Sequence, residues 1–132
     1  MHVFERKIRL QHTDGAGVVF FARFFELAHE AYEHLLDAIG HAFPADLAGE
    51  SILYPIVHAE SDYRAMLRLG DTLRIEVTVA EVKSRSFALT YRFVNPAGDE
   101  AAALKTVHVA VDKATGRSTR LPDDLADALR GV

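Results

Sequence analysis

Apolar and charged residues alternate along the first ten positions of the chain. Phe4, Ile8 and Leu10 fall on one side of this alternation together with Arg6, and the residues between them are mostly charged. A period of two is typical of a β-strand with one buried face. We therefore predict a strand here, with Arg6 as the one polar residue on its apolar side.

Between about Ala22 and Ile39 the apolar residues recur every three or four positions. They are Phe24, Phe25, Ala28, Ala31, Tyr32, Leu35 and Ile39, and a separate acidic stripe contains Glu26, Glu30, Glu33 and Asp37. This spacing predicts an amphipathic α-helix of about five turns. Gly40 is a typical residue to end it.

After a loop that carries Pro44 and Gly49, the sequence returns to a period of two. Two adjoining strands of a meander are predicted from Leu73, Ile75, Val77 and Val79 and from Phe87, Leu89, Tyr91 and Phe93. Further strands are predicted at Ile52 to Tyr63 and at Ala101 to Val111. Pro122 is predicted to begin a short C-terminal helix.

The order of these elements is one strand, one long helix, and then strands without another long helix. This order predicts the α+β class, with an antiparallel sheet wrapped around one long central helix in a single domain of residues 1–132. The outer strands of such a sheet have unpaired backbone groups, which another copy of the chain can cover. We therefore expect a homodimer.

Composition narrows the class of protein. The chain has 132 residues, of which 49% are hydrophobic and 26% charged, and its net charge is −4. These values are typical of a globular domain and argue against nucleic acid as a partner. The absence of cysteine excludes disulfides and thiolate metal sites. No apolar run approaches the roughly 20 residues of a membrane span, and no export signal is visible, so we expect a cytoplasmic protein without a membrane partner.

The segment from His12 to Phe21 is the most informative for chemistry. It contains Asp14 beside Gly15, Ala16 and Gly17, and it lies between the predicted strand and the predicted helix. Small residues allow a ligand to approach the backbone closely, and free amides at the start of a helix can hold an oxyanion. Asp14 could act as a nucleophile or general base, or it could only cap the helix or form an Asx turn.

The helix carries other candidate groups. His29 and Glu33 are four residues apart and could form an acid–base pair or bind a metal, but no third ligand stands at a suitable spacing. We therefore expect no metal. Solvated helix charge is the simpler interpretation of this pair.

The segment from Thr13 to Phe21, together with the Arg23-Phe24-Phe25 that follows it, resembles the signature of hotdog-fold acyl-CoA thioesterases of the 4-hydroxybenzoyl-CoA thioesterase family. Later parts of the chain agree, including Leu69-Gly70-Asp71 and Ser84 to Phe87. Within the family, His29 to Glu33 and Pro55 to Ala59 are most similar to the 1,4-dihydroxy-2-naphthoyl-CoA thioesterases. His12 stands where the family often has an acidic residue, and Met66 where it often has proline.

The resemblance implies roles for residues around the glycine loop. Asp14 would act on the thioester carbonyl, directly or through water, and the backbone amide of Phe21 would polarise its oxygen. Gly17 would make room for the thioester. A second subclass of hotdog thioesterases carries its carboxylate on the long helix, which makes Glu26, Glu30 and Glu33 the alternatives, and the presence of Asp14 in the loop favours the first subclass. Phe20, Phe24 and Tyr54 would form an apolar acyl pocket, although aromatic residues are also common in cores, and core packing is the alternative for Phe24.

The resemblance also implies contacts farther along the chain. His58 could hydrogen-bond a substrate hydroxyl or serve a structural role. Arg64, Lys83 and Arg85 are candidates to bind the phosphates of coenzyme A, with ordinary surface charge as the alternative. Coenzyme A is then part of the substrate, and no separate cofactor is expected.

The expected function is hydrolysis of an aromatic acyl-CoA thioester by a homodimer that associates further into a homotetramer, a dimer of dimers. The first choice of substrate is 1,4-dihydroxy-2-naphthoyl-CoA. A general or short-chain acyl-CoA thioesterase is the first alternative, and a non-catalytic acyl-CoA binding module is the second. A hotdog dehydratase fits less well, because the motif lacks a clear histidine and acid arrangement.

Overall fold

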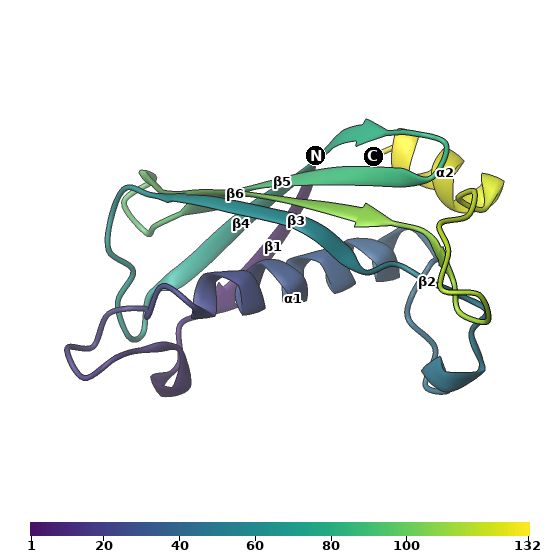
Figure 1. Ribbon diagram of the computed structural model, residues 1–132. Helices are drawn as coiled ribbons and strands as arrows, with labels where there is room; N and C mark the ends of the chain where they lie inside the picture. The colour runs from purple at the N-terminus through teal and green to yellow at the C-terminus, as the bar shows by residue number, and fades with distance from the viewer.

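The computed structural model describes residues 1–132 and contains one five-stranded sheet that covers one long helix (Figure 1). The sheet has the order β1-β4-β5-β6-β3, and all of its neighbouring strands are antiparallel. Its strands are β1 (His2–Lys7), β4 (Thr72–Val82), β5 (Ser86–Val94), β6 (Glu100–Val109) and β3 (Ile56–Tyr63). The α+β hotdog architecture that the sequence predicts is therefore confirmed.

Three smaller elements and the main helix complete the chain. The long helix α1 spans Arg23–Ala38, and the short helix α2 spans Asp123–Arg130. A separate two-stranded ribbon pairs β2 (Ile52–Leu53) with β7 (Val111–Asp112). Neither helix is long and apolar enough to cross a membrane.

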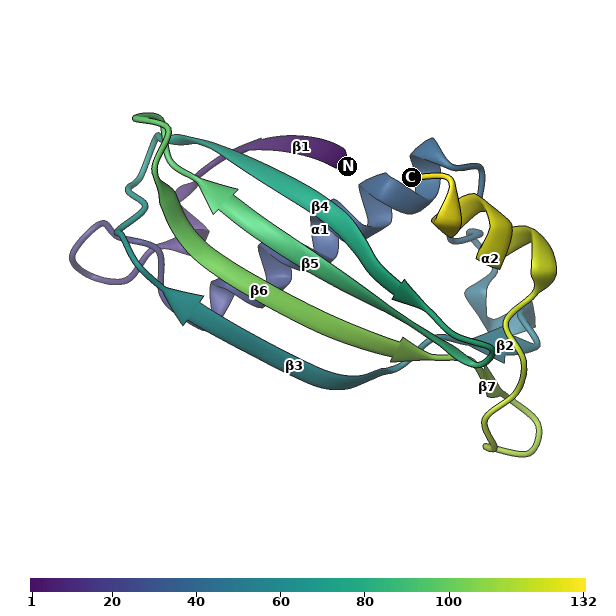
Figure 2. The same ribbon diagram turned by 90° about the horizontal axis from the view of Figure 1, so that it is seen from above.

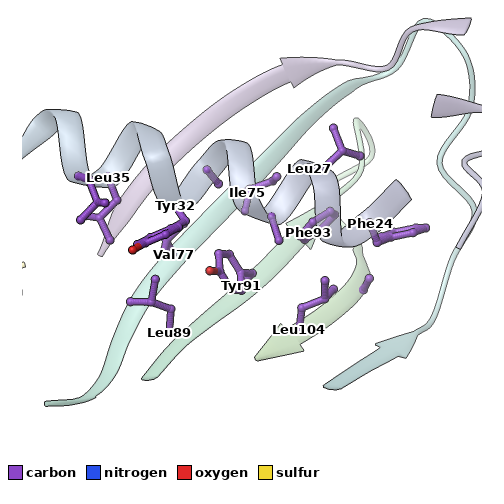
Figure 3. Packing of buried hydrophobic residues seen from close by; sticks show 14 of the residues in the cluster. Phe24, Leu27, Tyr32, Leu35, Ile75, Val77, Leu89, Tyr91, Phe93 and Leu104 are labelled. Atoms are coloured by element: carbon purple, nitrogen blue, oxygen red, sulfur yellow. The ribbon is translucent and has the colours of Figure 1, made fainter. Parts of the chain in front are cut away.

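The apolar face of α1 packs against the concave face of the sheet (Figure 3). Leu27, Tyr32 and Leu35 are each no more than 1% exposed. On the sheet they meet the inward-facing residues of β4, β5 and β6, which include Ile75, Val77, Leu89, Tyr91, Phe93 and Leu104. Burial of apolar surface at about 25 cal/mol per Å² makes this single contiguous core the main source of stability.

Arg6, the polar exception on the apolar side of β1, pairs with a carboxylate of α1. Its Nε lies 2.9 Å from Glu30 Oε2, and both side chains are partly buried. A buried guanidinium needs such a partner, because an unpaired charge away from water is costly. The exception in the alternation therefore marks a contact between β1 and α1.

Two sequence predictions need correction at the ends of strands. β1 ends at Lys7, and Leu10, which continues the alternation, lies in a 3-10 turn and is 73% exposed. The predicted strand from Ile52 to Tyr63 is divided between the ribbon and the main sheet. The division falls at Tyr54 and Pro55, where proline lacks the N–H that a continuous ladder requires.

The sheet has two distinct ends (Figure 2). We call the end with residues 8–22, the start of α1 and Tyr63 the loop end. We call the opposite end, with Tyr54, the β4–β5 connection, α2 and the last turn of α1, the hairpin end. Because α1 has 16 residues, the two ends are separated by about 24 Å along its axis.

Candidate active site

The glycine-rich segment forms a closed loop at the loop end. Thr13 and Val19 form an antiparallel bridge, and the Asp14 N–H donates to the Val18 carbonyl at 2.9 Å. The Phe20 N–H donates to the His12 carbonyl, also at 2.9 Å. These bonds bring the two sides of the loop together, so that Asp14 and Phe21 both lie close to its base.

The Asp14 carboxylate has one bonded oxygen and one free oxygen. Oδ1 accepts from the Ala16 N–H at 2.7 Å, which is an Asx turn, and Oδ2 has no hydrogen-bond partner in the chain. The side chain is exposed. Asp14 does not cap α1, because the N-cap is Ala22 and has no side-chain bond. The free oxygen is available to attack a carbonyl or to accept a proton from water.

The Phe21 amide is a free donor at the start of α1. Its N–H has no acceptor within the chain, whereas the next residues begin the helix with Arg23 N–H donating to the Phe20 carbonyl. The positive end of the helix dipole lies at this turn. A free N–H in that position can stabilise an oxygen that gains negative charge during acyl transfer.

Gly17 is required by the backbone rather than by the space around it. Its φ is +78°, a backbone conformation that residues with a side chain rarely adopt. A Cβ added there would meet no atom within 4 Å. Within one chain, Gly17 therefore shapes the loop that carries Asp14. The role that the resemblance gave it, making room for a thioester, is not visible in the single chain.

The three aromatic residues predicted to form an acyl pocket do not meet within one chain. Phe20 is exposed beside Phe21, with ring centroids 4.8 Å apart. Phe24 is only 4% exposed and packs in the core against Phe93 and Tyr63, at 5.5 and 4.9 Å. Tyr54 lies at the hairpin end, where its ring centroid is 6.2 Å from that of Phe87.

An apolar cavity of about 360 Å³ lies at the hairpin end, beside Tyr54. The last turn of α1, the loop after it, β2 and α2 contribute its walls, which include Leu36, Phe43, Leu47, Ile52, Tyr54 and Leu125. Tyr32 also lines it, and the Tyr32 hydroxyl is buried without a hydrogen-bond partner. Sequence reasoning missed this cavity, although apolar Phe43 and Leu47 in an otherwise irregular loop were a signal for it.

The predicted polar contacts are also divided between the two ends. Arg64 follows β3 at the loop end, where it pairs with Glu100 at 2.9 Å. Lys83 and Arg85 lie in the β4–β5 connection at the hairpin end. Lys83 pairs with Glu81 at 3.6 Å, and Arg85 donates to the Ser118 carbonyl at 2.9 Å.

His58 lies on the exposed strand β3. Its Nε2 is 3.6 Å from Glu60 Oε1. The His58 side chain is 55% exposed, and it lies outside the Asp14 loop. A position on an edge strand makes it accessible to another copy of the chain. The structure alone does not bring it into contact with Asp14 or Phe21.

The other carboxylates considered from the sequence each have a partner on or near α1. Glu26 pairs with Arg23 at 2.6 Å, Glu30 with Arg6, and Glu33 with His29 at 3.2 Å. No cluster of three or more His, Asp or Glu side chains is present that could hold a metal ion. Asp14 differs from these three carboxylates in having no ion-pair partner, since its one side-chain bond comes from the Ala16 N–H.

Comparisons with known proteins agree along the whole chain. Residues 8–129 match the model of the thioesterase-like superfamily. A 1,4-dihydroxy-2-naphthoyl-CoA hydrolase of Rippkaea orientalis is 38% identical over 100% of this chain and 97% of its own length, and one of Nostoc punctiforme is 34% identical over 96% and 84%.

Solved structures show the same fold. A 1,4-dihydroxy-2-naphthoyl-CoA thioesterase from Synechocystis superposes with a TM-score of 0.92 at 28% identity, covering 98% of this chain and 96% of its own. A gentisyl-coenzyme A thioesterase superposes with a TM-score of 0.86 at 26% identity, covering 97% and 99%.

Proposed function

This chain belongs to the thioesterase-like superfamily, and we propose that it hydrolyses aromatic acyl-CoA thioesters, with 1,4-dihydroxy-2-naphthoyl-CoA as its preferred substrate. The observation that carries the proposal is that one loop supplies both a free Asp14 oxygen and a free Phe21 N–H. A nucleophile or base beside an oxyanion donor is what acyl transfer requires. Relatives that act on this substrate match the chain from end to end.

The reaction follows from these two groups. Asp14 Oδ2 either attacks the thioester carbon itself or takes a proton from a water molecule that attacks it. The carbonyl oxygen gains negative charge, which the Phe21 N–H stabilises. The C–S bond then breaks, and the coenzyme A thiolate takes up a proton that water gives up. In the direct route the acyl group is then bound to Asp14 as an anhydride, and water hydrolyses this anhydride to restore the carboxylate. In both routes water supplies the second oxygen of the free acid.

We further propose that the working enzyme is a dimer joined through β3. This strand is one of the two edges of the sheet, and it is more exposed than the other edge strand, β1: nearly all of its residues are exposed, including Val57 at 60%. Antiparallel pairing of two β3 strands around a two-fold axis would place the loop end of one copy against the hairpin end of the other (Figure 2). A further pairing of two such dimers would give the expected homotetramer.

The dimer would bring together predicted site residues that lie at opposite ends of a single chain. The partner's Tyr54, with the cavity beside it, would approach Phe20 and Asp14, and the partner's Lys83 and Arg85 would approach the same site. A volume of 360 Å³ lies within the range of about 300–1,000 Å³ that ligand pockets occupy. Its mostly apolar walls suit a bicyclic ring.

The substrate proposal is tested by kcat/KM for a panel of acyl-CoA thioesters, measured from the release of free thiol. We expect hydroxylated bicyclic aromatic acyl groups to rank first, then benzoyl and phenylacetyl, and then short aliphatic groups. A site that hydrogen-bonds a substrate hydroxyl discriminates strongly against analogues that lack this hydroxyl. An apolar pocket discriminates between acyl chains by only about tenfold in kcat/KM per methylene. Fastest cleavage of aliphatic substrates would favour a general thioesterase, and binding without cleavage would favour the non-catalytic module.

A further inference from the structure

His12 lies at the base of the Asp14 loop, and it is one of few buried polar residues. It ends the 3-10 turn Leu10–His12 and is 4% exposed. Its backbone carbonyl accepts from the Phe20 N–H at 2.9 Å. The residue is therefore bonded to the segment of the loop that leads to Phe21, and only Thr13 separates it from Asp14.

The imidazole makes a second bond that depends on its charge. His12 Nδ1 accepts from the Arg9 N–H at 2.9 Å and so closes the 3-10 turn from its own side chain. Only a neutral ring, with its proton on Nε2, has a free lone pair on Nδ1. An imidazolium would direct a second N–H at the Arg9 N–H, and the bond would be lost.

We propose that His12 is a positioning residue that holds the Asp14 loop in its active geometry only while its imidazole is neutral. The inference rests on the proposed function, because it concerns the geometry of the same loop. It adds the requirement that the His12 imidazole is neutral, which the hydrolysis reaction alone does not imply. Turnover falls in acid through loss of the loop geometry.

The surroundings of His12 keep the ring neutral at neutral pH. Burial lowers its pKa below the usual 6.5, and the nearby positive charge of Arg6 on β1 acts in the same direction. Arg23 on α1 lowers the pKa as well, while Glu30 and Glu26 on α1 oppose the shift. The bond to Arg9 is therefore present at pH 7 and above and is lost as the pH falls through the lowered pKa.

Two substitutions separate this role from simple packing. In His12→Asn the side-chain Oδ1 can take the place of Nδ1 as acceptor, and it does not titrate. In His12→Phe the volume is kept and the acceptor is removed. His29→Asn is the matched control, because His29 is exposed on α1, where it pairs with Glu33 and its ring meets that of Tyr32 edge-on.

The first readout is the pH profile of turnover. At pH 7.5 we expect His12→Asn to keep kcat within about threefold of wild type, and His12→Phe to lose about tenfold in kcat with little change in KM, as removal of one hydrogen bond would give. The acid limb of wild type should contain a titration that is absent from the acid limb of His12→Asn. The control should match wild type.

A second readout does not depend on catalysis, so it distinguishes failure of this inference from failure of the proposed function. Hydrogen exchange of the Arg9 amide should become faster relative to its intrinsic rate as the pH falls in wild type and should stay protected in His12→Asn. Equal protection in both proteins at every pH would overturn the inference. So would an acid limb of turnover that His12→Asn leaves unchanged.

Discussion

The hydroxyl of Tyr63, near the end of β3, donates a 3.3 Å hydrogen bond to the carbonyl of Phe21 in the turn before α1. This bond joins the edge strand to the turn that presents the candidate oxyanion donor. The strand that we propose to form the dimer thus contacts the same turn. Assembly and catalysis should therefore be affected together by changes in β3.

A charge placed on the β3 edge should separate the copies. Val57→Asp introduces a carboxylate at an exposed position of β3, and in a two-fold interface it would be buried or repelled by its symmetry mate. We expect light scattering at micromolar concentration to give the monomer mass, with loss of turnover. Ala97→Asp, in the exposed β5–β6 turn, is the control. A fully active monomer of either wild type or Val57→Asp would contradict the shared site.

Mixed dimers test whether Asp14 and the cavity of the other copy form one site. Ala42→Trp adds bulk to the cavity wall, and Asp14→Asn removes the carboxylate, so each variant alone should have low turnover. In a statistical mixture half of the dimers are mixed, and one of their two sites has both parts intact. Activity should then recover to about a quarter of wild type. No recovery in verified mixed dimers would mean that each site lies within one copy.

The two glycines that flank Ala16 should respond differently to alanine. Gly17→Ala forces a side chain into a left-handed backbone conformation and should lower the free energy of unfolding by about 1 kcal/mol. Gly15 has neither a positive φ nor a close neighbour, so Gly15→Ala should leave stability unchanged or slightly higher. Urea denaturation of both variants measures the difference, and equal stabilities would contradict the backbone role assigned to Gly17.

Stability should fall in acid because of the buried residue His108. Burial lowers its pKa from 6.5 to about 4, although the nearby Tyr54 carbonyl partly opposes the shift. Between these values the unfolded chain binds more protons than the folded one, so stability is complete above pH 6.5 and decreases as the pH falls toward 4. The full shift corresponds to about 3 kcal/mol.

Urea denaturation at pH 7.5 and pH 5 measures this loss. His108 stacks on Phe87 at 4.7 Å, so His108→Phe keeps an aromatic ring in the core and removes the titration. Its stability should depend less on pH than that of wild type. The same loss in both proteins would assign the acid sensitivity to other groups.

Periodic segments were the part of the fold that the sequence predicted well. The helix expected over Ala22 to Ile39 is α1, Arg23–Ala38, and the helix after Pro122 is α2. Both have an apolar stripe that is buried in the hydrophobic core. The alternation beyond Lys7 gave a wrong prediction. Leu10 continues the pattern by coincidence, but it lies in a 3-10 turn and not in a strand.

The candidate site was predictable only where its residues are close in sequence. Asp14, Gly17 and Phe21 belong to one loop, whose glycines signal an unusual backbone. The location of Tyr54 and Lys83 at the opposite end from Asp14 depends on strand order and register, which one sequence does not specify. The cavity beside Tyr54 was missed because the loop after α1 has no periodicity.

The most direct test of the account is the turnover of Asp14→Asn on 1,4-dihydroxy-2-naphthoyl-CoA. This change removes the charge, nearly keeps the shape and leaves an oxygen for the Ala16 N–H, so the fold and loop should persist, as circular dichroism can verify. We predict that kcat falls by at least about a hundredfold, as is typical when a general base is lost. Glu26→Gln and Glu33→Gln should change it little, since both carboxylates already have partners. Near wild-type turnover by Asp14→Asn would contradict the account.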